Sequence, residues 1–170
     1  MKTFISSITL LTFLFFLEVN SLFAQDHKIL MEQIIEHYQK IGQGLSKGST
    51  EEITQHANAI VTTTDQIMKL QDGLPKEKRE QFNILVKRTN SYAKRLVGNK
   101  DIEVLRTEFD VLGKPLIGYL NTFGSDKKYF IYACEGDMNL WIQENKEPQQ
   151  DPYCDSPCGK IIDETRNKGD

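Results

Sequence analysis

Basic charge, cysteine and phosphate-binding loops are all scarce in this chain of 170 residues. Lysine and arginine number 21 against 24 aspartate and glutamate residues, which gives a net charge of −3. Without a basic field to meet a phosphate backbone, nucleic acid is excluded as a partner. We find no glycine-rich phosphate loop, expect no serine nucleophile elbow, and see no histidine near a cysteine in the sequence. These absences predict a protein that is not an enzyme.

Long apolar runs are also rare, and the one at the N-terminus is too short to cross a bilayer. It extends from Phe4 to Leu17, whereas a membrane-spanning helix needs about 20 residues. Lys2 precedes the run and the small residue Ala24 follows it, which is the layout of a secretory signal peptide over residues 1–24 with cleavage after Ala24. No cysteine follows Ala24, so a lipoprotein anchor is not expected. We expect a periplasmic or secreted protein with no stable membrane anchor after cleavage; an uncleaved N-terminal anchor is the alternative.

Four amphipathic helices are predicted in the part of the chain that follows. Apolar residues recur at steps of three and four, the period of a helix with one buried face. The helices are expected over about 26–45, 50–70, 75–96 and 102–120, with Ser49 and Asp101 as N-caps. The predicted buried stripes are Leu30, Ile34, Tyr38, Ile41 and Leu45; Ile53, Ala57, Ile60, Thr64 and Ile67; Phe82, Leu85, Thr89, Tyr92 and Leu96; and Ile102, Leu105, Phe109, Leu112, Leu116 and Leu120.

These helices predict an all-α fold. Four stripes of similar length with short connections indicate an up-down-up-down four-helix bundle over residues 25–124. A short irregular or β-structured segment, residues 125–160, is expected to pack on the bundle, with a strand in "KKYFIYAC". Its polar composition predicts that the remainder, residues 161–170, is a flexible tail.

Sulfur-containing side chains are concentrated in the C-terminal segment. Cys134 and Met138 lie in one short stretch, and Cys154 and Cys158 lie in another with the same separation. Thiolates and thioethers are soft ligands, so four sulfurs on two loops can form one metal site. The thioether favours Cu(I) over zinc, which prefers nitrogen and thiolate ligands. The spacing matches no recognised zinc pattern.

A disulfide is the alternative use of the same cysteines. Exported proteins sit in an oxidising compartment, where cysteines commonly pair. A bond from Cys134 to Cys154 or to Cys158 would clamp the strand to the following loop and stabilise the fold by about 2–4 kcal/mol. In that state no metal would be bound by the oxidised sulfurs. Residue types and spacing leave both readings open.

Two histidines on neighbouring predicted helices could face each other. His37 and His56 lie at similar distances from the turn around Ser46 to Ser49, so an antiparallel pair of helices would offset them by only about 3 Å along the axis. Each flanks the apolar stripe of its helix. They are candidate metal ligands, and two half-exposed histidines at the edge of the core are the alternative.

The order of motifs near the C-terminus resembles a known family. "LRTEFDVLGKPLIGYL", "YFIYACEGDMNLW" and "DPYCDSPCG" are similar to a bacterial family of exported helical domains of unknown function, found alone or attached to heavy-metal (copper) efflux adaptor proteins. The positions that match in order are Arg106, Phe109, Leu112, Gly113, Cys134, Met138, Trp141, Asp151 to Tyr153, and Cys158 with Gly159. The similarity is strong over about the last third of the chain.

The resemblance implies a helical bundle whose C-terminal segment binds a soft metal, with a heavy-metal efflux component as a partner. Cys134, Met138 and Cys158 carry over as ligands, whereas Cys154 is an additional thiol. "CEGDM" replaces a compact Cys-Pro-Met motif, and the histidines that members often carry on the third and fourth helices are absent here. The implied function is therefore a non-catalytic, exported Cu(I)-binding protein, with a disulfide-stapled interaction protein as the alternative.

Overall fold

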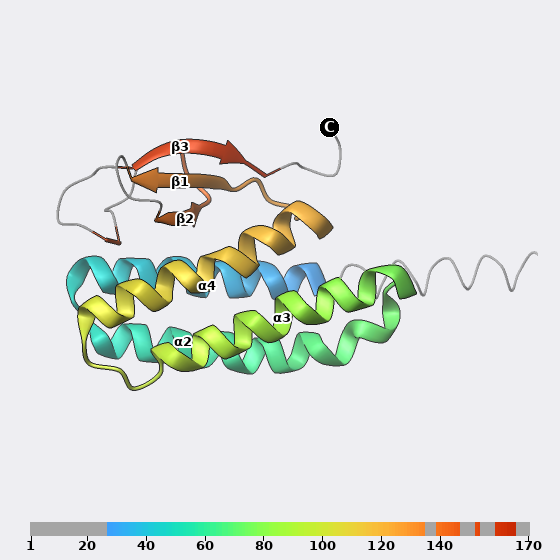
Figure 1. Ribbon diagram of the computed structural model, residues 1–170, viewed down its shortest axis with the longest axis horizontal. Coiled ribbons are helices and arrows are strands. Elements are labelled where there is room, and N and C mark those ends of the chain that lie inside the picture. The colour runs from blue at the N-terminus through green and yellow to red at the C-terminus, as the bar shows by residue number, and fades with distance from the viewer. Residues whose placement is uncertain (1–26, 135–138, 147–151, 154–158, 166–170) are drawn as a thin grey trace, which may run out of the picture.

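The protein is mostly helical, with a small sheet at its C-terminal end (Figure 1). The computed structural model describes residues 27–134, 139–146, 152–153 and 159–165. A first helix covers residues 27–47. Three further helices follow, α2 (Thr50–Ile67), α3 (Lys76–Leu96) and α4 (Ile102–Phe123), with a short 3-10 helix, η1 (Met68–Gly73), between α2 and α3. All four predicted helices are thus present. Among the described residues, no helix is long and apolar enough to span a membrane.

Local sequence signals set where the helices begin and end. The Ser49 side chain accepts a hydrogen bond from the Glu52 amide at the start of α2, and Asp101 accepts two amide hydrogen bonds at the start of α4. Both are the predicted N-caps, because their side-chain oxygens satisfy amides that have no partner within the helix. Gly48 and Gly124 follow the first helix and α4 with φ near +68° and +69°, a conformation that favours glycine.

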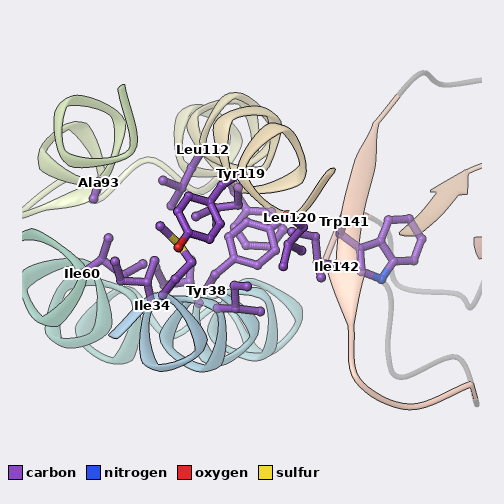
Figure 2. Close-up of a cluster of buried hydrophobic side chains, with 14 of the residues drawn as sticks. Ile34, Tyr38, Ile60, Ala93, Leu112, Tyr119, Leu120, Trp141 and Ile142 are labelled. Atoms are coloured by element: carbon purple, nitrogen blue, oxygen red, sulfur yellow. The ribbon is translucent and has the colours of Figure 1, made fainter. Parts of the chain in front are cut away.

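The core lies between the four helices, mostly on the predicted faces of the first helix, α2 and α4, where the predicted Leu30 and Ile102 are only partly covered (Figure 2). The prediction for α3 was partly wrong. Val86 and Ala93 are buried there, while the predicted Leu85 and Tyr92 are only partly covered. Both sets of residues recur at helical spacing. The period of the pattern therefore could not decide between two neighbouring positions, Leu85 or Val86 and Tyr92 or Ala93, for the buried face. Phe82, Thr89 and Leu96 belong to both sets and are buried.

Three antiparallel strands form the C-terminal sheet. They are β1 (Phe130–Cys134), β2 (Leu140–Gln143) and β3 (Gly159–Glu164), in the order β2-β1-β3. β1 lies within the predicted strand. The expected boundary of the flexible tail was wrong, because residues 161–164 belong to β3 and pair with β1. Thr165 extends this pairing, since its amide donates to the Tyr129 carbonyl and its hydroxyl accepts from the Tyr129 amide. Residues 161–165 are ordered by hydrogen bonds to β1 and Tyr129, which lie about thirty residues earlier. The composition of the segment gives no sign of these hydrogen bonds.

The sheet packs on the bundle through β2. In Figure 2, Ile142 lies on the side of β2 that faces the helices, and Trp141 lies on the opposite side. Both are almost fully buried, at 1% and 2% exposure. Alternation along a strand places successive side chains on opposite faces. β2 therefore has covered side chains on both faces, one against the helices and the other under Tyr132 and Tyr153.

Candidate functional site

Of the four predicted sulfur ligands, the structure describes Cys134. It is the last residue of β1, is half-buried, and is engaged in a disulfide. Met138, Cys154 and Cys158 lie outside the described residues. The pairing of Cys134 with Cys154 or Cys158, and the assembly of four sulfurs into one site, therefore stay predictions.

The strands around Cys134 bring the matching motifs together. Cys134 pairs with Gly159 across β1 and β3, and Tyr132 pairs with Trp141 across β1 and β2. The rings of Tyr132 and Trp141 stack at 5.4 Å between centroids with an interplanar angle of 19°. A Cβ atom on Gly159 would lie 2.3 Å from the Trp141 ring. The indole thus occupies the space above the glycine backbone, close to the strand position that carries Cys134.

Tyr153 connects this sheet to the bundle. Its hydroxyl donates to the Leu140 carbonyl at 3.1 Å, and its ring centroid lies 5.9 Å from those of Phe109 and Trp141. The preceding Pro152 is buried. Aromatic side chains contribute large apolar areas to such junctions, so the "PY" pair fixes the sheet against α4.

A polar cavity of about 290 Å³ lies beside this junction, lined by Glu103, Arg106, Thr107, Asp110, Asn139 and Tyr153. Arg106 forms an ion pair with Glu103 at 2.7 Å, while its buried Nε has no hydrogen-bond partner among the residues that the structure describes. Asp110 bonds Lys114 at 2.7 Å and accepts from the Leu140 amide at 3.3 Å. The charges that line this cavity are therefore largely paired within α4. Asp110 also positions the start of β2 through its hydrogen bond with the Leu140 amide.

Tyr38 was predicted to be buried, but sequence reasoning missed its part in this junction. It stacks on Phe109 at 4.3 Å with an angle of 9°, and its hydroxyl donates to the Leu140 carbonyl at 3.5 Å. A Cβ on Gly113 would lie 2.7 Å from that hydroxyl, so α4 approaches the first helix closely here. Burial raises the pKa of Tyr38 well above its usual value, and the charges of Tyr153 and Asp110 raise it further. Tyr38 is therefore a neutral hydrogen-bond donor.

His37 and His56 face each other across the first helix and α2, as their distances from the turn predicted. Their Nδ1 atoms are 3.1 Å apart, and their ring centroids are separated by 5.3 Å. Burial lowers the pKa of His56, and His37 and Lys40 lower it further, against the opposite effect of Glu52 and Glu36. Whether they bind metal stays a prediction. Within the described residues, no group of three or more His, Cys, Asp or Glu residues is placed to hold a metal ion.

His27, which the sequence left without a role, is buried against α3 and α4. Its Nδ1 bonds the Tyr119 hydroxyl, and the rings of Phe82, Tyr119 and Phe123 surround it. Burial raises the pKa of Tyr119, and the charge of Glu32 raises it further. A single histidine before the first apolar stripe carried no signal for this hydrogen bond, because its partner Tyr119 lies 92 residues later.

The chain contains one segment with the spacing of a nucleophile elbow, Gly44-Leu45-Ser46-Lys47-Gly48. An elbow places its serine on a sharp turn between a strand and a helix. Here the segment lies at the end of the first helix, and the Ser46 hydroxyl donates to the Gly42 carbonyl at 3.0 Å. The spacing therefore arises from a helix end and supplies no elbow.

No protein-family model, curated protein or solved structure matches this chain. The resemblance to exported domains linked to copper efflux therefore stays a prediction from the C-terminal motifs. The assignment of function depends on the residues and contacts described above.

Proposed function

We propose that this protein is an exported, non-catalytic interaction protein, an up-down-up-down helical bundle stapled to its C-terminal sheet by a disulfide. The disulfide at Cys134 is the observation that carries the proposal. Cys134 ends β1, the central strand, so a covalent bond there ties the sheet to the segment that precedes β3. In the periplasm or outside the cell such a bond persists. The third cysteine then remains as a thiol that can meet a partner.

A count of thiols tests this proposal directly. Full-length protein is denatured without reductant, alkylated, and weighed intact by mass spectrometry, with a reduced sample as the control. One alkylated cysteine and a mass deficit of two protons are expected. Three alkylated cysteines in freshly isolated protein would rule the disulfide out.

Soft-metal binding is the second proposal, and it concerns the reduced protein. A disulfide at Cys134 requires two sulfurs to approach within bonding distance, so reduction would leave two thiols close together. With Met138 as a thioether ligand, such a pair favours Cu(I) over zinc. The function would then belong to heavy-metal efflux or homeostasis, with an efflux component as partner.

Reduced protein distinguishes the two proposals. It is titrated with Cu(I) against a competing chelator, alongside Cys134→Ser and Met138→Leu variants. Metal binding predicts one tightly held ion and a large loss of affinity in Cys134→Ser, because a thiolate ligand is removed. Equal affinity of both variants and the unmodified chain would eliminate this second function while leaving the thiol count unaffected.

A further inference from the structure

The histidine pair between the first helix and α2 has a geometry that the cysteine-centred proposals do not use. His37 and His56 approach through the same ring atom, Nδ1, at 3.1 Å. A neutral imidazole has one N–H donor and one lone pair. Two neutral rings at this distance can share one proton between their Nδ1 atoms. When the donor ring instead carries its proton on Nε2, both Nδ1 lone pairs are available and a metal ion can take the place of the shared proton.

The two rings are held in place by the helices that carry them. Tyr38 adjoins His37 and Ala57 adjoins His56, and both neighbours are fully buried at 0% exposure. The short connection through Gly48 and Ser49 joins the two helices. Near it a Cβ on Gly44 would stand 2.9 Å from Ile53 Cγ1. Such close packing fixes the separation of the two ring nitrogens before any ligand arrives, which lowers the entropic cost of binding.

We propose that His37 and His56 form a two-histidine site for a divalent cation of the zinc, copper(II) and nickel class. Imidazole nitrogens suit these ions, at bond lengths of about 2.0–2.1 Å. An ion equidistant from two nitrogens 3.1 Å apart would subtend an angle of about 100° at those bond lengths. That angle lies between the square-planar and tetrahedral values. A linear two-histidine Cu(I) site would need nitrogens about 4 Å apart at the same bond lengths, so the observed separation does not fit that geometry.

Nearby charges favour a cation at this place. Glu36 adjoins His37 and Glu52 lies one turn before His56, and both carboxylates oppose the lowering of the pKa of His56. Lys40 acts in the opposite direction. With two protein ligands, water molecules complete the coordination. The site uses no sulfur and is therefore independent of the disulfide and of Cu(I) binding.

Zinc titration of the full-length, oxidised chain, with its remaining thiol alkylated, tests the proposal. Isothermal titration calorimetry should give one Zn²⁺ ion per chain. His37→Asn and His56→Asn should each weaken binding by at least about tenfold, since loss of even a supporting group in a metal site has an effect of this size. Gln33→Asn and Gln55→Asn are matched controls, because both glutamines are exposed on the same two helices, and they should bind Zn²⁺ normally.

A measurement on the unmodified sequence covers the case in which a histidine variant fails to fold. In nitrogen NMR spectra of imidazole-labelled protein, Zn²⁺ should shift two Nδ1 signals together, those of His37 and His56, and leave His27 unchanged. Zinc that shifts His27 alone, or that shifts no imidazole nitrogen at millimolar concentration, would overturn the proposal. So would an affinity that is equal in His37→Asn, His56→Asn and the unmodified chain.

Discussion

At the scale of single residues, Gly159 leaves the least room for a side chain among the glycines that the structure describes. The Trp141 ring occupies the position that a side chain there would need, with Cβ only 2.3 Å away. Gly159→Ala should therefore lower the free energy of unfolding by about 1–3 kcal/mol, because overpacking shifts neighbours from their preferred rotamers. Urea unfolding followed by far-UV circular dichroism measures the change.

Gly118→Ala on α4 is the matched control for that substitution. Its Cβ would meet only the end of the Leu85 side chain, at 3.0 Å, and alanine is favoured over glycine in a helix by about 1 kcal/mol. This variant should be neutral or more stable. Equal losses in the two variants would show that the Trp141 contact does not limit Gly159.

His56 should make the stability depend on pH in a defined window. Its pKa in the folded protein is lowered from 6.5 by burial, then by His37 and Lys40, against Glu52 and Glu36. Below about pH 6.5 the unfolded chain therefore binds a proton at this residue before the folded protein does. The free energy of unfolding should decrease as the pH falls below about 6.5, until His56 is protonated in the folded protein too. Above that window His56 should have no effect on stability.

Urea midpoints at pH 7.5, 6.5 and 5.5 measure this effect. His56→Gln should show a smaller decrease than the unmodified chain, whereas the exposed Gln55→Asn should keep the full decrease. If the difference between His56→Gln and the unmodified chain did not vary with pH, the lowered pKa would have no consequence for folding.

The residues that were predicted well are those whose partners are near in sequence or related by one short turn. The facing of His37 and His56 followed from counting outward from one connection, because rise per residue is fixed in a helix. Tyr38 and His27 were different. Their hydrogen-bond partners, Leu140 and Tyr119, come from elements about a hundred residues away. The periodicity of apolar residues within a helix does not indicate which distant group will form a hydrogen bond with a buried polar atom.

At the scale of elements, the N-cap residue Asp101 is a local sequence signal that determines where α4 begins. Asp101 accepts hydrogen bonds from the Glu103 and Val104 amides at 3.0 and 3.3 Å. Asp101→Ala should reduce the free energy of unfolding by about 0.5–2 kcal/mol, the usual effect of losing an N-cap. Chemical denaturation measures it, and Asp101→Ser should retain most of the stability. A loss in Asp101→Ser as large as that in Asp101→Ala would contradict the capping role.

The strands show where reasoning from the sequence stopped. β1 is rich in aromatic and β-branched residues and was predicted. β3 is not, since its sequence is "GKIIDE" and most of it is exposed. Its order comes from pairing with β1, including the contact of Tyr132 with Ile161 and a register shift between Ile131 and Tyr132. Pairing between strands separated by about thirty residues depends on the closure of the intervening loop, which composition does not encode.

At the scale of the whole molecule, the structure joins two units of different construction. The apolar core is formed mostly by the helices and continues into the sheet at Trp141 and Ile142, while the sheet is small and is also held by Tyr153 and the disulfide at Cys134. Cys134→Ser should therefore loosen the sheet before the bundle. The free energy of unfolding of the sheet should fall by about 2–4 kcal/mol, as for removal of other disulfides.

Hydrogen exchange followed by mass spectrometry resolves the two units. In Cys134→Ser, peptides covering β1 and β3 should exchange faster, while peptides from α2 and α3 should keep their protection. The control is the unmodified chain after its disulfide has been reduced. This reduced chain and Cys134→Ser should exchange alike, because both lack the disulfide. Uniform acceleration of all peptides would indicate that sheet and bundle unfold as one unit.

The packing of Trp141 also has an optical consequence. It is the only tryptophan of the chain and is 2% exposed, with its ring stacked on Tyr132 on the sheet. Indole fluorescence shifts to longer wavelength when water reaches the ring, so the emission of this protein reports the state of the sheet alone. The helices contain no tryptophan in the described residues and are silent at that wavelength. The molecule thus carries a built-in fluorophore beside its disulfide, and a change of redox state or partner at that end can be read in real time without a label.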